Sequence, residues 1–578
     1  MFSPASTPGC KLLFAERRNP ARFPGTRVCD ASVLVLLHDL AAYCKLEDPG
    51  LNCNPWHHVA VPTDLSDLEK RLWESADQLR ANSSLTPSDY RGPILGLIFL
   101  AFAEHRYAEI TPELQANATP RNPVKPENYH AKGVLYVPDE ALLSKLVALE
   151  EGVEGGVGKK IDEAMAAIEA NNSGLKDVLP RGYPKLESNL LQDLLRLFAP
   201  LPKTLSGDAF GLIYEYFLSS FAMAEGRLGG EFFTPQSIVR LIVEIIQPFE
   251  GKVFDPACGS GGMFVQCAKF VGRHQGSATR DLSVYGQEQK EVTVPIGKMN
   301  LALHGLSGDI RQANSYYEDP HTATGKFDFV MANPPFNVNG VDKAKLEGQT
   351  YRLPYGVPKP DNGNYVWIQL FASALGPKGR AGFVMANSAS DARSSEAEIR
   401  RQLIEDQIVD VMAAVGPNMF YSVTLPVTVW FFDKAKRGTD RAGTVLFIDA
   451  RNTFRQIDRA HRDFRPDQVE LLANIVRLYR GEPTESIDGS DIRIKELFPD
   501  GTYLDVAGLC KIATIKEIEA QGWSLNPGRY VGTEAADDHD GNFAERLAAL
   551  HAEFTKLSDE AAGLRLTVDR SVAAVLST

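Results

Sequence analysis

Cysteine is scarce in this sequence, and its spacing carries no metal or disulfide motif. The chain has seven cysteines in 578 residues, with no CxxC pair and no cluster of histidines beside them. Zinc sites and disulfide frameworks require such pairs or clusters. We therefore expect neither of them, and we assign no metal-ligating residues.

A long apolar run is also missing. The best candidate, Val33–Cys44, is shorter than the roughly 20 residues that span a bilayer, and His38 and Asp39 interrupt it. It also lacks the layout of a signal peptide. The sequence thus predicts a soluble, cytoplasmic protein without a membrane partner.

Positive charge is in deficit, because the net charge is −13. A protein that binds DNA alone normally has a basic surface that neutralises phosphates. Either DNA is not the substrate, or another chain supplies much of the phosphate contact. A Walker A loop is absent too: Gly152–Gly158 is rich in glycine, but Lys160 stands where Ser or Thr is required. We interpret that segment as a connector and assign no ATP-driven role.

Composition and periodicity change along the chain. Residues 1–63 are rich in Pro, Arg and Cys, which predicts a poorly ordered extension. Residues 64–185 predict a helical domain, because Asp64–Arg80 has amphipathic spacing and Pro93–Phe102 is an apolar helical run.

Residues 186–535 alternate short apolar strands with helical stretches. This alternation is typical of an α/β domain with a mostly parallel sheet. The expected strands are Lys252–Asp255, Ser283–Gln287, Phe327–Ala332, Gly382–Ala386, Val409–Ala413, Val427–Asp433 and Thr444–Asp449.

The tail, residues 536–578, has a heptad pattern in which apolar residues step by four and three. This pattern predicts a helix that packs either on its own domain or on a partner chain. The apolar positions are Phe543, Leu547, Leu550, Phe554, Leu557, Ala561, Leu564 and Val568.

A glycine-rich turn, Phe254–Gly262 (FDPACGSGG), joins an expected strand to a helix. Glycine lets the backbone approach a ligand closely and adopt positive φ. The turn follows the carboxyl end of a strand, where open α/β sheets bind nucleotides. It lacks the GxGxxG spacing of dinucleotide enzymes, and a purely structural turn is the alternative interpretation.

An acidic residue, Glu288, follows at the end of the next expected strand. A carboxylate in this position can accept hydrogen bonds from both hydroxyls of a ribose. Taken alone, Glu288 would more often be an ordinary surface residue.

The most specific motif is Asn333-Pro334-Pro335-Phe336, directly after the apolar strand Phe327–Ala332. Two consecutive prolines stiffen the backbone and remove two N–H donors, so carbonyl oxygens can point into a pocket. Asn333 adds a side-chain acceptor and Phe336 an aromatic ring. The loop could hold an amine between two acceptors while a ring stacks on it; a proline-stiffened turn is the structural alternative.

These motifs together resemble the amino-methyltransferases that modify exocyclic amines, and NPPF is similar to the adenine-N6 group. Further segments resemble the modification subunits of type I restriction-modification systems: Gly230–Gln236 (GEFFTPQ), Leu72–Arg80, Leu95–Leu100 and Ser524–Tyr530 (SLNPGRY). The resemblance covers residues 64–532, and residues 1–63 have no counterpart that we recognise.

The resemblance implies a Rossmann-like methyltransferase domain flanked by an N-terminal helical domain and a C-terminal helical tail. It implies methyl transfer from S-adenosylmethionine to N6 of adenine in DNA. The catalytic residues would be Asn333, Pro334, Pro335 and Phe336. The cofactor would contact Glu231, Phe232, Phe233, Thr234, Pro235, Gln236, Asp255, Gly259, Ser260, Gly261, Gly262, Glu288 and Asn314.

The contact to the cofactor's adenine stays open between two residues. Asn314 occupies the position where the family often has Asp, and Asp309 lies in a similar context nearby. We favour Asn314.

Target recognition is expected to lie on another chain. Residues 263–332 are filled by expected strands and helices, and no zinc finger, helix-turn-helix or basic module stands out after residue 449. The resemblance implies a specificity subunit, a second modification subunit, a restriction subunit and double-stranded DNA as partners. The loop Asn337–Asn364, with Lys343, Lys345, Arg352 and Lys359, is either a local DNA contact or a solvated lid.

Two other functions compete with this interpretation. Enzymes that methylate a glutamine amide in proteins or a guanine amine in RNA also use Asn-Pro-Pro-aromatic loops, but the helical region and GEFFTPQ argue against them. An inactive assembly or DNA-binding module is the other alternative, and the intact Asp255, Glu288 and Asn333 argue against it.

Overall fold

The structure of the chain is a computed structural model. It describes residues 87–150, 152–198, 234–274, 276–277, 281–359, 363–420, 425–458 and 461–533, with residues 214 and 217 and parts of 547–565. The predicted extension 1–63, the helix expected at 64–80 and residues 231–233 lie outside these ranges. Among the helices described, none combines the length and apolar character needed to cross a membrane.

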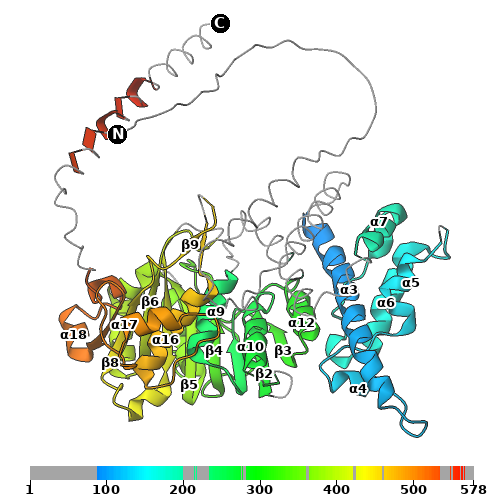
Figure 1. Ribbon diagram of the computed structural model, residues 1–578, viewed down its shortest axis with the longest axis horizontal. Coiled ribbons are helices and arrows are strands. Elements are labelled where there is room, and N and C mark those ends of the chain that lie inside the picture. Colours follow the sequence, from blue (N-terminus) through cyan, green and yellow to red (C-terminus); the bar gives the residue numbers. More distant parts are fainter. Residues whose placement is uncertain are drawn as a thin grey trace, which may run out of the picture. The chain divides into compact units, whose positions relative to one another are not determined.

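The first described part of the chain is helical (Figure 1). The apolar run predicted at Pro93–Phe102 lies inside a long helix, and its side chains from Ile94 onward are buried in a core of their own. The helices are α3 (Pro87–Ala116), α4 (Pro126–His130), α5 (Leu143–Val147), α6 (Gly156–Asn171) and α7 (Ser188–Phe198), with 3-10 turns η1 (Asp139–Ala141), η2 (Ser173–Leu175) and η3 (Tyr183–Lys185).

The structure of this helical part differs from the sequence-based predictions in two places. α6 begins at Gly156, so the segment predicted as a connector supplies the first turn of a helix. Gly158 is buried there, and a Cβ on it would lie 2.6 Å from the Tyr183 carbonyl oxygen, so only glycine allows this contact. The helical core also extends past the predicted boundary at residue 185, because α7, Tyr214 and Phe217 belong to it.

A nine-stranded sheet follows, in the order β11-β8-β6-β7-β5-β4-β1-β2-β3. Only β7 and β11 run antiparallel to their neighbours, so the predicted mostly parallel sheet is confirmed. The strands are β1 (Gly251–Asp255), β2 (Leu282–Glu288), β3 (Gly308–Gln312), β4 (Phe327–Ala332), β5 (Leu375–Ala386), β6 (Val409–Val415), β7 (Val427–Asp433), β8 (Thr444–Asp449) and β11 (Cys510–Thr514), and β9 (Arg455–Gln456) pairs separately with β10 (Arg462–Asp463).

Helices cover both faces of the sheet, because alternate strand residues enter two different cores. In β1, Val253 joins the core under one set of helices and Phe254 joins the core under the other. The first set (Figure 1) is α9 (Gln236–Ile246), α10 (Gly262–Arg273), α16 (Pro466–Arg480) and α17 (Asp491–Leu497). The second is α14 (Asn364–Ala374), α15 (Ser395–Glu405) and α18 (Ile515–Ala520).

One further helix, α12 (Val294–Leu303), connects the sheet domain with the helical part. Its Ile296, Met299 and Leu303 are buried in the core of the helical part, whereas Leu301 is buried in the sheet core. α12 therefore belongs to both packing units.

The tail is described only in part. Leu547 and Phe554 of the predicted heptad pattern lie in helical segments, and their exposed fractions are 55% and 70%. The other positions of the pattern that the structure leaves undescribed stay predictions.

Candidate active site

Four adjacent strands end at the same edge of the sheet, since β4, β1, β2 and β3 are neighbours and run parallel. Phe254 in β1 is in register with Val330 in β4. Adjacent strands lie about 4.8 Å apart. The glycine-rich turn after Asp255 and the NPPF loop after Ala332 therefore leave neighbouring strands side by side.

The glycine-rich turn has a backbone that requires glycine and an open outer side. Gly259 and Gly261 adopt φ values of +52° and +78°, a region that side chains rarely tolerate. A Cβ added to Gly259 or Gly262 would meet no atom within 4 Å. The turn thus presents bare main chain to open space, where a ligand can approach it closely.

The inner side of the same turn rests on α12. The buried Asn300 side chain donates a hydrogen bond of 2.9 Å to the Ser260 carbonyl oxygen. A Cβ on Gly297 would lie 3.2 Å from the Gly259 carbonyl oxygen and 2.9 Å from the Ile310 side chain. Asn300 could not be identified from the sequence, because a contact between segments so far apart leaves no local pattern.

Glu288 lies beside the turn at the end of β2. Its carboxylate accepts hydrogen bonds from the N–H groups of Gly259, at 3.0 Å, and Lys290, at 2.8 Å. The Cys258 N–H also donates to the Gln287 carbonyl oxygen at 3.0 Å. The predicted acidic residue and the predicted turn are therefore hydrogen-bonded to each other.

Asp255 is buried at the start of the turn, where its carboxylate accepts a hydrogen bond of 2.9 Å from the Ala257 N–H. Burial raises the pKa of Asp255 to about 8, and the negative charge of Glu288 adds to the rise. A carboxyl group with this pKa is mostly protonated at neutral pH.

The two candidates for the adenine contact occupy different positions. Asp309 lies within β3, opposite Tyr285, and its carboxylate is paired with the Arg311 guanidinium at 2.6 Å. Asn314 follows β3, directly after Ala313, whose N–H donates to the Glu288 carbonyl oxygen at 3.0 Å. The geometry thus favours Asn314, which lies at the same edge as Glu288.

The NPPF loop is half-buried at this edge. Asn333 is half-buried, and its side-chain nitrogen donates a hydrogen bond of 2.8 Å to the Thr234 hydroxyl. Pro334 is buried, and Phe336 packs partly against the sheet core. Asn333 is therefore neither enclosed in the core nor remote from the turn.

The GEFFTPQ segment is described from Thr234 onward. Thr234 fixes the Asn333 amide, Pro235 is buried, and the exposed Gln236 is the first residue of α9. The structure thus places Thr234 against the NPPF loop. Glu231, Phe232 and Phe233 lie outside the described residues and stay predictions.

A second asparagine holds the end of the loop. Asn337 has a positive φ of 53°, a region in which asparagine is enriched. Its N–H donates to the Asn364 side-chain oxygen at 2.9 Å, and the Asn364 amide donates back to the Asn337 side chain at 2.8 Å. This reciprocal pair fixes the residue that follows Phe336, and no local sequence pattern predicts it.

Comparison with known proteins identifies the family. Residues 205–539, more than half of the chain, match the family described as N-6 DNA Methylase, and residues 68–198 match the HsdM N-terminal domain. The chain belongs to the N-6 DNA methylase family.

Similar proteins are methylase subunits of type I restriction enzymes. This chain is 36% identical over 524 residues to the type I restriction enzyme MjaIX methylase subunit of Methanocaldococcus jannaschii, and the match covers 86% of this chain and 90% of the relative. It is 37% identical to the HindI methylase subunit of Haemophilus influenzae, over 71% and 91% of the two chains. The resemblance stated from the sequence is therefore confirmed.

A solved structure has the same fold as the methylase. The type I restriction-modification methyltransferase subunit of Streptococcus thermophilus superposes with a TM-score of 0.61 at 19% identity, over 81% of this chain and 99% of that one. The predicted fold class, an α/β methyltransferase domain with a helical domain before it, is confirmed.

Proposed function

We propose that this chain is the modification subunit of a type I restriction-modification system and transfers a methyl group from S-adenosylmethionine to N6 of adenine in DNA. One observation carries this proposal: the glycine-rich turn and the NPPF loop leave neighbouring parallel strands, with Asn333 fixed by Thr234. A donor at the turn and a base at the loop would then be in contact.

The residues at the turn fit this cofactor. Open space faces Gly259 and Gly262, the Glu288 carboxylate suits a ribose, and the buried Asp255 carboxyl group can ionise beside a positive charge. Glu288 would hold the ribose hydroxyls and Asn314 the adenine, while Ser260 and Gly261 would line the methionine end. When bound, the cofactor supplies an electrophilic methyl group.

The NPPF loop would hold the target adenine. The Asn333 side-chain oxygen and the Pro334 carbonyl oxygen would accept the two hydrogens of the N6 amine, which favours a pyramidal nitrogen with an available lone pair. Pro335 would keep the loop rigid and Phe336 would stack on the base. Holding both reactants in place can lower the barrier by about 7–11 kcal/mol at best. The base must first leave the duplex, at a cost of a few kcal/mol.

Other chains would supply target recognition. The net charge of −13 supports this proposal, because an acidic chain neutralises few phosphates and a specificity subunit would then supply most of the phosphate contacts. The exposed Leu547 and Phe554 support a tail helix that binds another subunit. A second modification subunit and a restriction subunit would complete the complex in the cytoplasm.

The loop after NPPF remains a candidate for local DNA contact, with one correction. Lys345 and Lys359 are exposed and Lys343 is half-buried, as a phosphate contact requires. Arg352, which was included in the same prediction, is only 5% exposed. Its guanidinium instead donates hydrogen bonds to the main-chain carbonyl oxygens of Ser315 and Tyr316.

Modified-base sequencing tests the proposed function. DNA is sequenced from cells that express this chain with and without the neighbouring specificity subunit. We expect N6-methyladenine at a split target motif only when both chains are present. Methylation of RNA or protein by the pair, with unmodified DNA, would contradict the proposal.

A further inference from the structure

Arg352 is a buried cation that the proposed chemistry does not use. Its guanidinium donates hydrogen bonds to the carbonyl oxygens of Ser315, at 2.5 Å, and Tyr316, at 3.4 Å. It also donates to the Gln349 side-chain oxygen at 2.7 Å. An arginine bound in this way contacts two successive main-chain carbonyls with two separate nitrogen atoms, a rigid fork that a lysine does not have.

The two segments that Arg352 joins belong to different halves of the proposed site. Arg352 lies in the segment that follows the NPPF loop, whereas Ser315 and Tyr316 directly follow Asn314. One more hydrogen bond connects the same segments, because the Asp342 N–H donates to the Tyr317 hydroxyl at 2.8 Å. The Trp367 indole of α14 also donates to the Tyr316 hydroxyl at 2.6 Å.

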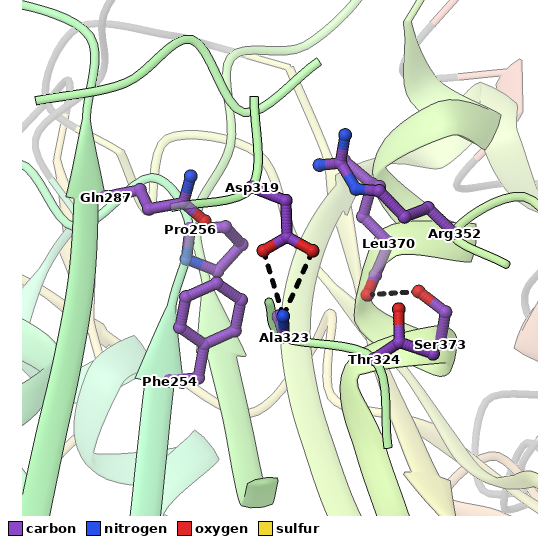
Figure 2. Close-up of a pocket in the computed structure, with 9 residues that line it drawn as sticks. All are labelled: Phe254, Pro256, Gln287, Asp319, Ala323, Thr324, Arg352, Leu370 and Ser373. Atoms are coloured by element: carbon purple, nitrogen blue, oxygen red, sulfur yellow. Dashed lines mark hydrogen bonds between the residues drawn. The ribbon is translucent and has the colours of Figure 1, made fainter. Parts of the chain in front are cut away.

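Residues 313–317 are also tied to the cofactor side. The Ser315 hydroxyl donates a hydrogen bond of 2.6 Å to the carbonyl oxygen of Pro256 in the glycine-rich turn. Pro256 and Arg352 line the same hollow, together with Asp319, whose two carboxylate oxygens accept from the Ala323 N–H (Figure 2). Residues 313–317 thus lie between the turn and the loop segment, with hydrogen bonds to both.

We propose that Arg352 is a positioning residue that couples occupancy of the cofactor site to the order of the segment that follows the target-base loop, residues 338–359. The inference rests on the proposed function, because it assumes that the cofactor's adenine contacts Asn314. A ligand that immobilises residues 313–317 also immobilises their carbonyl groups. The Arg352 fork then holds residues 338–359, so ordering at one site is transmitted to the other.

Hydrogen exchange of the full chain tests this coupling. Peptides from residues 313–317 and 338–359 are compared with and without S-adenosylhomocysteine, the product form of the cofactor. In the wild type we expect the ligand to slow exchange in residues 338–359 about tenfold, within the 5–150-fold range of linked sites. In Arg352→Met the ligand still slows exchange in residues 313–317, but its effect on residues 338–359 falls below about twofold.

Two further variants complete the test. Lys359→Met removes an exposed cation from the same segment and keeps the wild-type response. Arg352→Lys keeps a positive charge but replaces the two-nitrogen fork with one ammonium group on a flexible stem, so its response also falls below about twofold, whether or not Arg352→Met folds. A full response of residues 338–359 in either Arg352 variant overturns the inference. A wild-type chain that does not bind S-adenosylhomocysteine overturns the proposed function, and the coupling with it.

Discussion

A single buried carboxyl group gives the proposed cofactor site a dependence on pH. Asp255 is 1% exposed, and burial raises its pKa to about 8 from a usual value of 3.8. Between these two pH values the folded protein keeps a proton that the unfolded chain has lost. The contribution of Asp255 to the unfolding free energy is therefore greatest below pH 3.8 and falls as the pH rises towards 8.

The affinity for a positively charged cofactor should rise with pH, whereas the contribution of Asp255 to stability falls. A sulfonium and an ammonium group near Asp255 favour its ionised form, so binding below pH 8 releases a proton. We expect the affinity for S-adenosylmethionine to rise with pH by up to about tenfold per unit from pH 6, and to level off above pH 8. Calorimetric titration at several pH values measures this. Asp255→Asn should flatten the profile, and a flat profile in the wild type would refute the assignment.

Residues with local motifs could be predicted, and residues that act across the fold could not. Glu288 and Asn333 follow apolar strands directly, so their position at the sheet edge was implied by the sequence. Asn300 and Arg352 act on main-chain carbonyls of distant segments. Nothing in the neighbouring sequence distinguishes such residues from ordinary polar positions, which is why Arg352 was grouped with the exposed cations of a loop predicted as either a DNA contact or a solvated lid.

At the scale of elements, α12 links the proposed cofactor site to the helical part. One side of α12 supports the glycine-rich turn through Asn300 and Gly297, and another buries Ile296 and Met299 in the helical core. Gly305, just after α12, comes so close to Gly133 that a Cβ would lie 2.6 Å from its carbonyl oxygen. A shift of α12 would therefore disturb both units.

Gly297→Ala tests the support that α12 gives to the turn. The added methyl group would lie 2.9 Å from the Ile310 side chain and 3.2 Å from the Gly259 carbonyl oxygen, so the turn must shift. We expect the affinity for S-adenosylhomocysteine to fall about tenfold, since overpacking typically costs about 1–3 kcal/mol. Gly272→Ala in α10 is the matched control, because its Cβ would meet no atom within 4 Å. Equal affinities in both variants, measured by calorimetry, would show that the turn does not depend on α12.

Strand prediction succeeded where apolar residues dominate. β4, β7 and β8 have the predicted bounds, because each is a continuous, mostly apolar run. β3 (GDIRQ) was missed, since Ile310 is its only buried residue and it lies at the edge of the sheet. The start of α6 was missed, because Gly156 and Gly158 lie in the segment predicted as a connector, and the close contact of Gly158 with η3 leaves no local pattern.

At the scale of the molecule, the edge of the sheet opposite the active site contains a buried network of charges. Asp410, at the start of β6, is fully buried and paired with Arg441 at 2.5 Å, Arg480 at 3.0 Å and Lys436 at 3.7 Å. These cations come from three different elements and hold the turn between β7 and β8. The positive neighbours lower the pKa of Asp410 against the opposing effect of burial.

Removal of the central carboxylate should destabilise the whole domain and leave the active site intact. Asp410→Ala removes the carboxylate paired with the buried Lys436 and Arg480, and loss of a buried partner typically costs about 3–5 kcal/mol of unfolding free energy. Urea denaturation measures this loss, and the folded fraction should bind S-adenosylhomocysteine normally. Asp440→Ala, at an exposed position nearby, should change stability by less than about 0.5 kcal/mol. Similar stability of the two variants would contradict this role for the network.

The order of the strands could not be predicted from the sequence alone. The sequence indicated a mostly parallel sheet, but β7 lies antiparallel between β5 and β6, and β11 pairs at the far edge with β8. Both placements depend on pairing between distant segments, which local periodicity does not report.

The central claim is that Asn333 acts on the target base and not on the cofactor. The most direct measurement compares Asn333→Ala with Asn339→Ala, which alters an exposed asparagine of the same loop. Each is assembled with the specificity subunit and assayed for N6-methyladenine and for binding of S-adenosylhomocysteine. We expect Asn333→Ala to lower methylation on the order of 100-fold or more, as for loss of a preorganised polar contact, with cofactor affinity unchanged. Normal methylation by Asn333→Ala, or loss of methylation and cofactor binding together, would contradict the claim.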